Sequence, residues 1–431
     1  TSYPNLLGIA LRDDNFTRSG LPPPENYGAD NSYLVSLDLG FADESFTVYD
    51  HPKVLIFENT SRYTQDQLTS LLLASKGHTD LALMLTPTEL QIQREGGTHS
   101  KIFNPESISN KVPVLVWLLL IETVSLVAIP LGFVVFRGLS DKGFLLSKIM
   151  GLLLFAYIPW LLAATKLIEF SAASIFLSLI LLAVPGLAIF IVMRKQILSF
   201  ISERWRILAF EELLFLIAFL AFLALRWANP DLWHPFRGGE KPMDFAYLNA
   251  IIHSSTMPPY DPWFAGGFLN YYYFGQFIIA TVIKATGILP EIAYNLAIPL
   301  LFALTVAGAF SIVYNLTDSI RDRRWEQRGA RWGPPAAGVA AALLVVVLGN
   351  IDGMVQLVQG ANTALFSKES FPAFDFWRST RMMPPDPPGF EITEFPYFSF
   401  LFADLHAHLI AIPFTLLVAG TTLSLVLSTL R

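Results

Sequence analysis

The chain of 431 residues is 53% hydrophobic and only 15% charged. Apolar runs of twenty or more residues in such a composition are typical of an α-helical integral membrane protein and argue against a soluble domain. The formal net charge of −6 offers no basic surface, so we expect no nucleic-acid partner. Because the chain has no cysteine, a disulfide framework and cysteine-ligated metals are excluded.

Residues 1–110 are polar and lack long apolar runs, so we predict a small soluble α/β segment, the tail of a preceding module in a longer polypeptide. Two runs of β-forming residues, 45–49 and 54–58, predict short strands. Thr86 is followed by proline and then, three residues on, by glutamate. This capping-box pattern predicts a helix over 87–95.

The remainder of the chain predicts an all-α polytopic fold with about seven to eight transmembrane helices. Residues 111–206 are predicted to form a three-helix transmembrane linker, and residues 207–431 a membrane module that is truncated at its C-terminal side. The apolar segments, in chain order, are 112–136, 144–165, 171–193, 207–227, 272–288, 293–316, 336–349 and 401–430.

Basic residues determine the predicted orientation. The loops 137–148 and 194–206 carry most of the cations between the first spans, and by the positive-inside rule they face the cytoplasm. Residues 1–110 and the loop 228–271 are then extracytoplasmic. We therefore expect a multi-pass protein of the cell membrane.

One apolar segment must not cross the membrane if the remaining charges obey the same rule. Loop 317–334 contains five arginines and should lie inside, whereas residues 350–400 should lie outside. Two crossings at 272–288 and 293–316 would reverse this arrangement. We predict that 272–288 does not cross, because its roughly 17 residues fall short of the ~20 that a span needs.

A polar and aromatic block, Glu240–Gln276, holds the first candidate site residues. Residues 244–253 predict an interfacial helix that presents Asp244, a carboxylate suited to general-base catalysis or cation binding unless it only caps the helix. Asp261 precedes a proline, where it either receives turn amides or binds substrate. An interfacial aromatic belt is the alternative to substrate binding for the tyrosine triplet. The other predicted substrate-binding residues are Asn270, Tyr271, Tyr272 and Tyr273.

Two arginines in a proline-stiffened loop form a second candidate group. Arg378 and Arg381 are predicted to hold a phosphate group by paired hydrogen bonds. The alternative is pairing with acidic side chains nearby. The candidates for that pairing are Asp375, Asp386 and Glu394.

The third group lies at the start of the last apolar segment. Asp404 and His408 are four residues apart, share one face of a helix and are predicted to be catalytic. On a helix His406 would be rotated by about 200° away from Asp404. The group could therefore bind a divalent cation, Mg²⁺ or Mn²⁺, only if the segment is not helical. The predicted metal ligands are Asp244, Asp404, His406 and His408.

Four motifs, in this order, resemble the YYY membrane protein family, which is named for its tyrosine triplet. The motifs are DFAYLNAIIHS with PPYDPWFAGGFLNYYYFGQ (244–276), GNIDG (349–353), FDFWRSTRMMPPDPPGFEITEFPYFSF (374–400) and FADLHAHL (402–409). The likeness extends over residues 207–431.

The layout of this family is similar to that of GT-C glycosyltransferases, polytopic enzymes that use polyprenyl-phosphate-linked sugars. The resemblance implies that Asp244, with Glu240 as the weaker candidate, is the acidic residue of the first outer loop. It also implies membrane lipids and a polyprenyl-phosphate sugar as partners. This chain departs from the pattern, since its loop contains no Asp-x-Asp or Asp-Glu pair.

The leading hypothesis is a membrane glycosyltransferase at the outer face, in which Asp244 is the base and Asp404 and His408 complete the site. A non-catalytic scaffold that binds a partner or lipid through its aromatic outer loops is the alternative. A metal-dependent hydrolase or transporter ranks third. A transferase needs a cavity open to lipid and water, lined by Asp244 and Asp404 with a basic residue nearby, whereas scattered buried carboxylates would favour the scaffold. The sequence leaves the oligomeric state open.

Overall fold

The computed structural model contains two compact units, residues 1–80 with 233–238 and residues 81–232 with 239–431. The described residues are 5–6, 9–12, 35–38, 63–67, 70, 84–95, 99–232, 239–324, 332–349, 351–367, 370–375, 377–380 and 394–430.

The first unit contains a small sheet of three short strands. Strand β1 (Asn5–Leu6) pairs antiparallel with β2 (Ile9–Arg12), and β2 pairs in parallel with β3 (Val35–Asp38). The strands predicted at 45–49 and 54–58 lie outside the described residues.

The second unit opens with the helix that the capping box predicts. Helix α3 (Pro87–Glu95) begins and ends at the predicted residues. The Thr86 amide donates to Glu89 Oε2 at 2.8 Å, and the Glu89 amide donates to Thr86 Oγ1 at 3.3 Å. These reciprocal bonds satisfy two amides that have no partner inside the helix. The short helices α4 (His99–Ile102) and α5 (Ile108–Lys111) follow.

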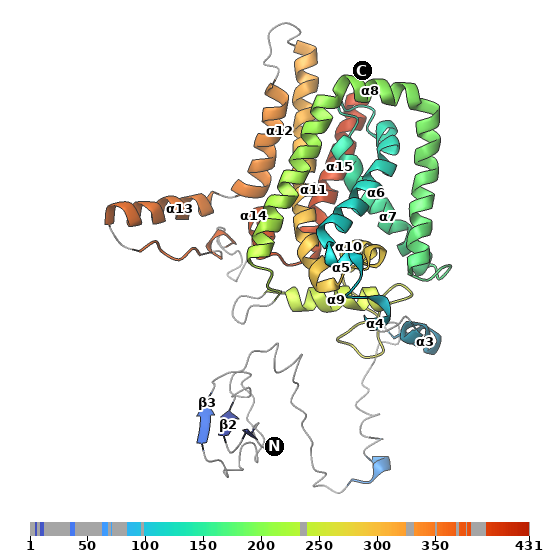
Figure 1. Ribbon diagram of the computed structural model, residues 1–431, viewed down its shortest axis with the longest axis vertical. Coiled ribbons are helices and arrows are strands. Elements are labelled where there is room, and N and C mark those ends of the chain that lie inside the picture. Colours follow the sequence, from blue (N-terminus) through green and yellow to red (C-terminus); the bar gives the residue numbers. More distant parts are fainter. Residues whose placement is uncertain are drawn as a thin grey trace. The chain divides into compact units, whose positions relative to one another are not determined.

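A bundle of long apolar helices forms the core of the second unit (Figure 1). Its members include α6 (Pro113–Val135), α7 (Phe144–Ala164), α11 (Pro290–Arg324) and α15 (Ala407–Thr429). The central helix is α11, whose apolar part is 83% buried, against 33% for α6 and for α15. The outer helices thus expose apolar side chains, which fits a lipid surrounding.

Helix α8 (Ala172–Ala228) is continuous over 57 residues. A straight helix of that length would measure roughly 86 Å, far more than one bilayer core. Figure 1 shows that it rises along one side of the bundle, bends over the top and descends on the other side. The segment 194–206, predicted as a loop, is helical because it contains neither proline nor glycine to end the helix.

Five helices are long and apolar enough to cross a membrane, or six if one bent helix pair counts as a span, among the described residues. This number is lower than the predicted seven to eight. The predicted spans 171–193 and 207–227 share α8, and α10 (Phe274–Thr286) has only 13 residues.

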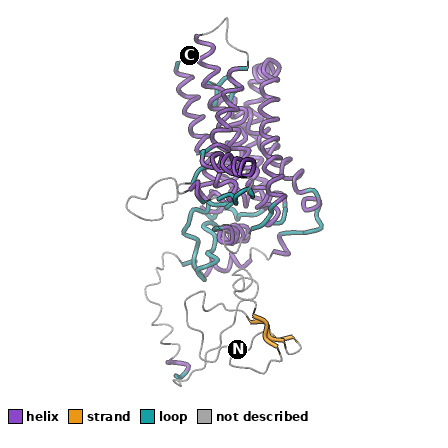
Figure 2. The backbone as a smooth tube through the Cα atoms, turned by 90° about the vertical axis from the view of Figure 1, so that its left-hand side faces the viewer, coloured by secondary structure: helices purple, strands orange, loops and turns teal. Residues whose placement is uncertain are grey.

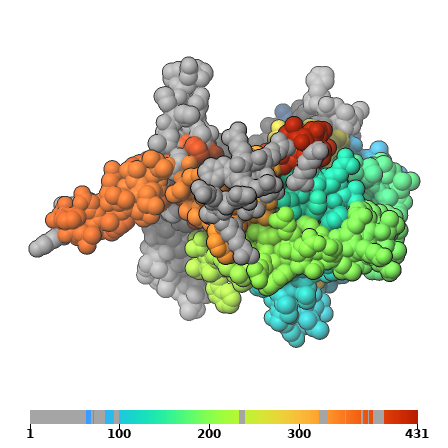
Figure 3. Space-filling view, turned by 90° about the horizontal axis from the view of Figure 1, so that it is seen from above, coloured from blue at the N-terminus to red at the C-terminus, as the bar shows by residue number. Residues whose placement is uncertain are grey.

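The bent pair corresponds to the predicted span 336–349. Helix α12 (Gly333–Leu343) continues into the π-helical turn η3 (Leu344–Leu348), and the segment Asp352–Ser367 departs at 73°. That segment contains α13 (Asp352–Asn362) and η4 (Thr363–Ser367). Figure 3 shows α13, in orange, extending away from the bundle.

The structure agrees with the prediction that 272–288 does not cross. The Asn110 side-chain amide donates to the Gly287 carbonyl at 3.1 Å, and the Leu289 amide donates to Asn110 Oδ1 at 2.8 Å. Because Asn110 lies just before α6, these bonds hold the C-terminal end of α10 where α6 and α11 begin. Helix α10 therefore starts and ends near the same end of the bundle (Figure 1).

We call this end of the bundle the α9 end, after the helix α9 (Lys241–His253) that lies across it. Most of the described loops gather there (Figure 2). It also holds α14 (Pro396–Phe402). The predicted span 401–430 begins later than expected, at Ala407, because Ala403 adopts φ +63° and the chain is not helical from 403 to 406.

Candidate functional site at the α9 end

Three segments that are far apart in the sequence meet at the α9 end. They are the start of α9, the tyrosine triplet before α10, and the break between α14 and α15. The break turns the residues 404–406 out of the helical geometry, so their side chains face α9 instead of following one helix face. The N-terminus of α9 then brings acidic and basic groups to the same place.

Asp244 is the most deeply buried member of this group, with no exposed surface. Its Oδ1 accepts a hydrogen bond from Gln276 Nε2 at 3.0 Å and lies 3.3 Å from His406 Nδ1. Its Oδ2 has no hydrogen-bond partner among the described residues. Burial raises the pKa of Asp244, and His406 offsets this effect only in part.

His406 connects the buried carboxylate to the surface. Its Nδ1 lies 2.9 Å from Glu240 Oε2, and its Nε2 lies 2.9 Å from the Tyr271 hydroxyl. The contact with Asp244 raises the pKa of His406, against the opposing effect of burial. Glu240 has a side chain 58% exposed, so it is the carboxylate that a ligand from solvent can reach.

Asp404 pairs with the first residue of α9. Lys241 Nζ lies 3.2 Å from Asp404 Oδ1, and the Glu240 amide donates to Asp404 Oδ2 at 2.9 Å. The same Nζ lies 4.6 Å from the ring centroid of Phe402, a cation–π contact. Burial raises the pKa of Asp404 to about 6, although Lys241 acts in the opposite direction.

Gly239 permits this close approach. It adopts φ +61°, a left-handed conformation that side chains disfavour, and a Cβ there would overlap the Phe402 ring and the Asp404 carboxylate. The turn before α9 therefore requires glycine at this position.

The Asp404→Asn variant is expected to remove part of the pH dependence of stability. The carboxyl has a pKa of 3.8 in an unfolded chain and about 6 here, so the folded protein binds the proton more tightly. Its stabilising contribution is complete below the unfolded pKa and is lost as pH rises through 6, by at most about 3 kcal/mol. Thermal unfolding in detergent between pH 4 and 7 measures this slope. The stability of the variant should depend less steeply on pH than that of the wild type, and an unchanged slope in Asp404→Asn would contradict the assignment.

The other predicted catalytic residue, His408, borders the group. Its Nε2 lies 2.7 Å from Glu394 Oε2, and its ring centroid lies 5.2 Å from that of His406. The His408 side chain is 48% exposed. The structure thus brings together Asp244, Asp404, His406 and Tyr271, with His408 at the rim.

The tyrosine triplet divides between three environments. Tyr271 contacts His406, whereas Tyr272 is 75% exposed. The Tyr273 hydroxyl accepts from Trp160 Nε1 at 3.1 Å, on α7. Asn270 is exposed at the turn before the triplet. One tyrosine of the triplet therefore belongs to the group.

Asp261 adopts the turn geometry that was the alternative to substrate binding. Its Oδ1 accepts from the amides of Trp263 at 2.7 Å and Phe264 at 3.1 Å. Such a side-chain-capped turn explains an aspartate before proline without a ligand.

Arg378 pairs with an acidic residue other than the three expected. Its Nε and Nη2 lie 2.9 and 2.8 Å from Asp352 Oδ1 on α13, and its side chain is 44% exposed. The segment nevertheless adjoins the group at the α9 end, because the Trp377 ring packs 5.2 Å from that of Phe402. Arg381 and Asp386 lie outside the described residues.

The predicted metal ligands do not form one ligand set in the described part of the chain, where no group of three or more His, Asp or Glu side chains has the geometry to hold a metal ion. Asp404 faces Lys241, and His408 faces Glu394. Uptake of Mg²⁺ or Mn²⁺ stays a prediction, and no step below depends on it.

Three residues of the site were not among those predicted from the sequence: Lys241, Gln276 and Tyr294. The Tyr294 hydroxyl accepts from the Leu405 amide at 2.7 Å and so helps to hold the break between α14 and α15. A signal for Gln276 was available, since it is a polar side chain in the first turn of the mostly apolar helix α10. The roles of Lys241 and Tyr294 could be identified only from the tertiary structure.

An apolar cavity of about 470 Å³ lies beside α14. Phe400 and Leu401 of α14 line one wall, and Met354 and Leu357 of α13 line another. Its lining includes neither Asp244 nor Asp404. It is nevertheless adjacent to the group, since Phe402, which follows these two α14 residues, packs against Lys241.

Comparison with known proteins identifies the membrane part. Residues 154–430 match the family described as an uncharacterized membrane protein (DUF2298). No curated protein and no solved structure matches the chain. The matched segment contains every residue of the group at the α9 end.

Proposed function

Since the chain belongs to the DUF2298 family of membrane proteins and gathers ionisable side chains at one end of its bundle, we propose that it is a glycosyltransferase. The donor is a polyprenyl-phosphate-linked sugar, and the α9 end faces the outer side of the membrane. The GT-C-like layout belongs to this proposal. The observation that carries it is the convergence of Glu240, Asp244 and Asp404 on His406 and Lys241.

In the proposed reaction an acceptor hydroxyl attacks the anomeric carbon of the donor sugar. A new carbon–oxygen bond forms, the bond from this carbon to the phosphate oxygen breaks, and the polyprenyl phosphate leaves. Glu240 accepts the proton of the hydroxyl, because it is the exposed carboxylate. Asp244, our sequence candidate for the base, is fully buried in this state and acts through His406.

The lipid part of the donor fits the surroundings of the group. The isoprenoid chain occupies the apolar cavity beside α14, whose lining residues Phe400 and Leu401 lie just before the break that holds Asp404. The phosphate then lies near the exposed basic side chains at the rim. These are His408 and Arg378, with Arg381 from the sequence prediction.

The test is transfer of a labelled sugar from a polyprenyl-phosphate donor by the purified protein, with donors of different chain length. The Met354→Trp variant fills the cavity and is expected to raise the KM for long-chain donors about tenfold, equivalent to ~1.4 kcal/mol, because their apolar burial is lost. Short-chain donors and the control Leu365→Trp, on the exposed η4, should show no change. An equal effect on all donors would exclude the cavity as the binding site of the isoprenoid chain. Absence of transfer in the wild type would contradict the proposal itself.

A non-catalytic scaffold is the second candidate, and one observation favours it. On α13 the polar residues Asp352 and Gln356 face inward, whereas Met354, Leu357 and Val358 are about half exposed or more. Such an outward apolar face suits a membrane surface or a partner protein. If the wild type transfers no sugar and Val358→Asp changes its oligomeric state in detergent, the scaffold is the better reading.

A further inference from the structure

A second polar cluster lies at the opposite end of the bundle, where the loop between α6 and α7 meets α8 and α11. Asp141 of the loop and Glu211 of α8 are both without exposed surface. Acidic side chains are almost never fully buried unless they are paired, and inside a membrane bundle they mark functional sites. Neither residue belongs to the group at the α9 end.

Asp141 is surrounded by hydrogen-bond donors that stabilise its ionised form. Its Oδ1 accepts from the Gly143 amide at 2.7 Å, and its Oδ2 accepts from the Ser311 hydroxyl at 3.1 Å. Its own amide donates to Asn315 Oδ1 at 3.3 Å, which holds the loop against α11. Burial raises the pKa of Asp141, and these hydrogen bonds offset that effect in part, so they favour the ionised form of Asp141 over that of a carboxyl group without donors.

Glu211 has the opposite surroundings. Neither of its oxygens receives a hydrogen bond from any donor in the described part of the chain. Its carboxyl group lies within hydrogen-bond reach of the Asp141 carboxyl group. A buried, ionised carboxylate without donors is costly, and two carboxylates in contact do not both ionise. A proton on Glu211 removes both costs at once.

We infer that Glu211 and Asp141 form a proton-binding site, in which Glu211 carries the proton and donates a hydrogen bond to Asp141. Lys148 of α7 does not neutralise the pair, because its ammonium group is held by Glu122 of α6 and Glu212 of α8. Among the described residues, Tyr314 and Asp318 of α11 and Arg204 of α8 also face the cluster.

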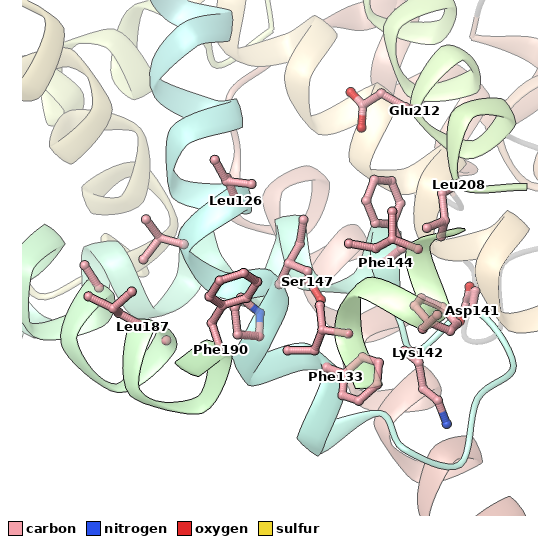
Figure 4. A pocket seen from close by; sticks show the side chains of 18 of the residues that line it. Leu126, Phe133, Asp141, Lys142, Phe144, Ser147, Leu187, Phe190, Leu208 and Glu212 are labelled. Atoms are coloured by element: carbon pink, nitrogen blue, oxygen red, sulfur yellow. The ribbon is translucent and has the colours of Figure 1, made fainter. Parts of the chain in front are cut away.

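A largely apolar cavity lies beside Asp141. It measures about 810 Å³, lies between α6 and α8, and has Asp141 on its wall (Figure 4). In Figure 4 the apolar side chains Leu187 and Phe190 lie on one side of the cavity, and Asp141 and Lys142 lie on the other. Asp141 therefore lines the cavity, whereas Glu211 is not one of the lining residues.

Infrared spectroscopy of the purified protein tests the proposal. The wild type at neutral pH should show the carbonyl stretch of a protonated, buried carboxylic acid. The band should be lost in Glu211→Gln and retained in the matched control Glu212→Gln, because the Glu212 carboxylate is paired with Lys148. In the wild type itself, ¹³C-labelled glutamate should shift the band and ¹³C-labelled aspartate should not. A band that follows aspartate, or no such band, overturns the assignment.

Thermal unfolding provides a second readout. The neutral amide of Glu211→Gln donates to Asp141 as the protonated acid does, so its Tm at neutral pH should stay within a few degrees of the wild type. At alkaline pH the wild type should lose stability and the variant should lose less, because only the wild type must give up this proton. Saturable stabilisation of the wild type by Na⁺ or K⁺, absent from Glu211→Gln, would show a bound cation instead and overturn the inference.

Discussion

Glu240→Gln is expected to lower the rate of sugar transfer on the order of 10²- to 10⁴-fold, the range for loss of a general base. The amide keeps the size of the side chain and its reach to His406 Nδ1, but it cannot accept the proton of the acceptor hydroxyl. Turnover with saturating donor measures the effect. Because the side chain is 58% exposed, folding should be nearly unaffected.

Two variants make this result specific. Glu291→Gln removes an exposed acid at the start of α11, at the same end of the bundle, and should retain full turnover. Asp244→Asn should lower turnover and also shift the pH profile downward, because the contact with Asp244 raises the pKa of His406. Wild-type turnover in Glu240→Gln would exclude it as the base, and unchanged turnover in Asp244→Asn would remove Asp244 from the mechanism.

Lys148→Met is expected to cost about 3–5 kcal/mol of stability, the range for breaking a buried ion pair on one side. The Lys148 side chain is only 1% exposed and contacts Glu122 of α6 as well as Glu212 of α8, the latter at 3.0 Å. Its loss leaves two partly buried carboxylates without their cation, where three helices meet. Unfolding by denaturant in detergent measures the change in free energy.

The chain offers a matched control for this variant. Lys111 pairs with Glu106 at 3.3 Å, but both side chains are well exposed, so Lys111→Met should cost no more than about 1 kcal/mol. Adding Glu122→Gln and Glu212→Gln to Lys148→Met should recover most of the stability, since no unpaired buried charge then remains. Equal losses of unfolding free energy in the two lysine variants would show that the buried pairing stabilises the fold no more than the exposed one.

Local patterns explain which elements could be predicted. The capping box at Thr86 predicted α3 to the residue, because its hydrogen bonds involve only neighbours in the sequence. The short length of 272–288 correctly predicted a segment that does not cross. Helix α8 contains both predicted spans, 171–193 and 207–227, but the basic segment 194–206 between them was predicted as a loop, although nothing in that segment ends a helix.

The sequence by itself determined the class of the protein and the kinds of residue in its candidate site, because apolar run length and side-chain chemistry are local properties. Asp244, Asp404 and His406 were all identified in this way. Only the tertiary structure decided how they combine, since the left-handed turn at Ala403 and the packing of α9 beneath α14 bring together groups separated by some 160 positions in the chain. It also decided that Asp244 is buried and Glu240 exposed, because burial depends on neighbours that are distant in sequence.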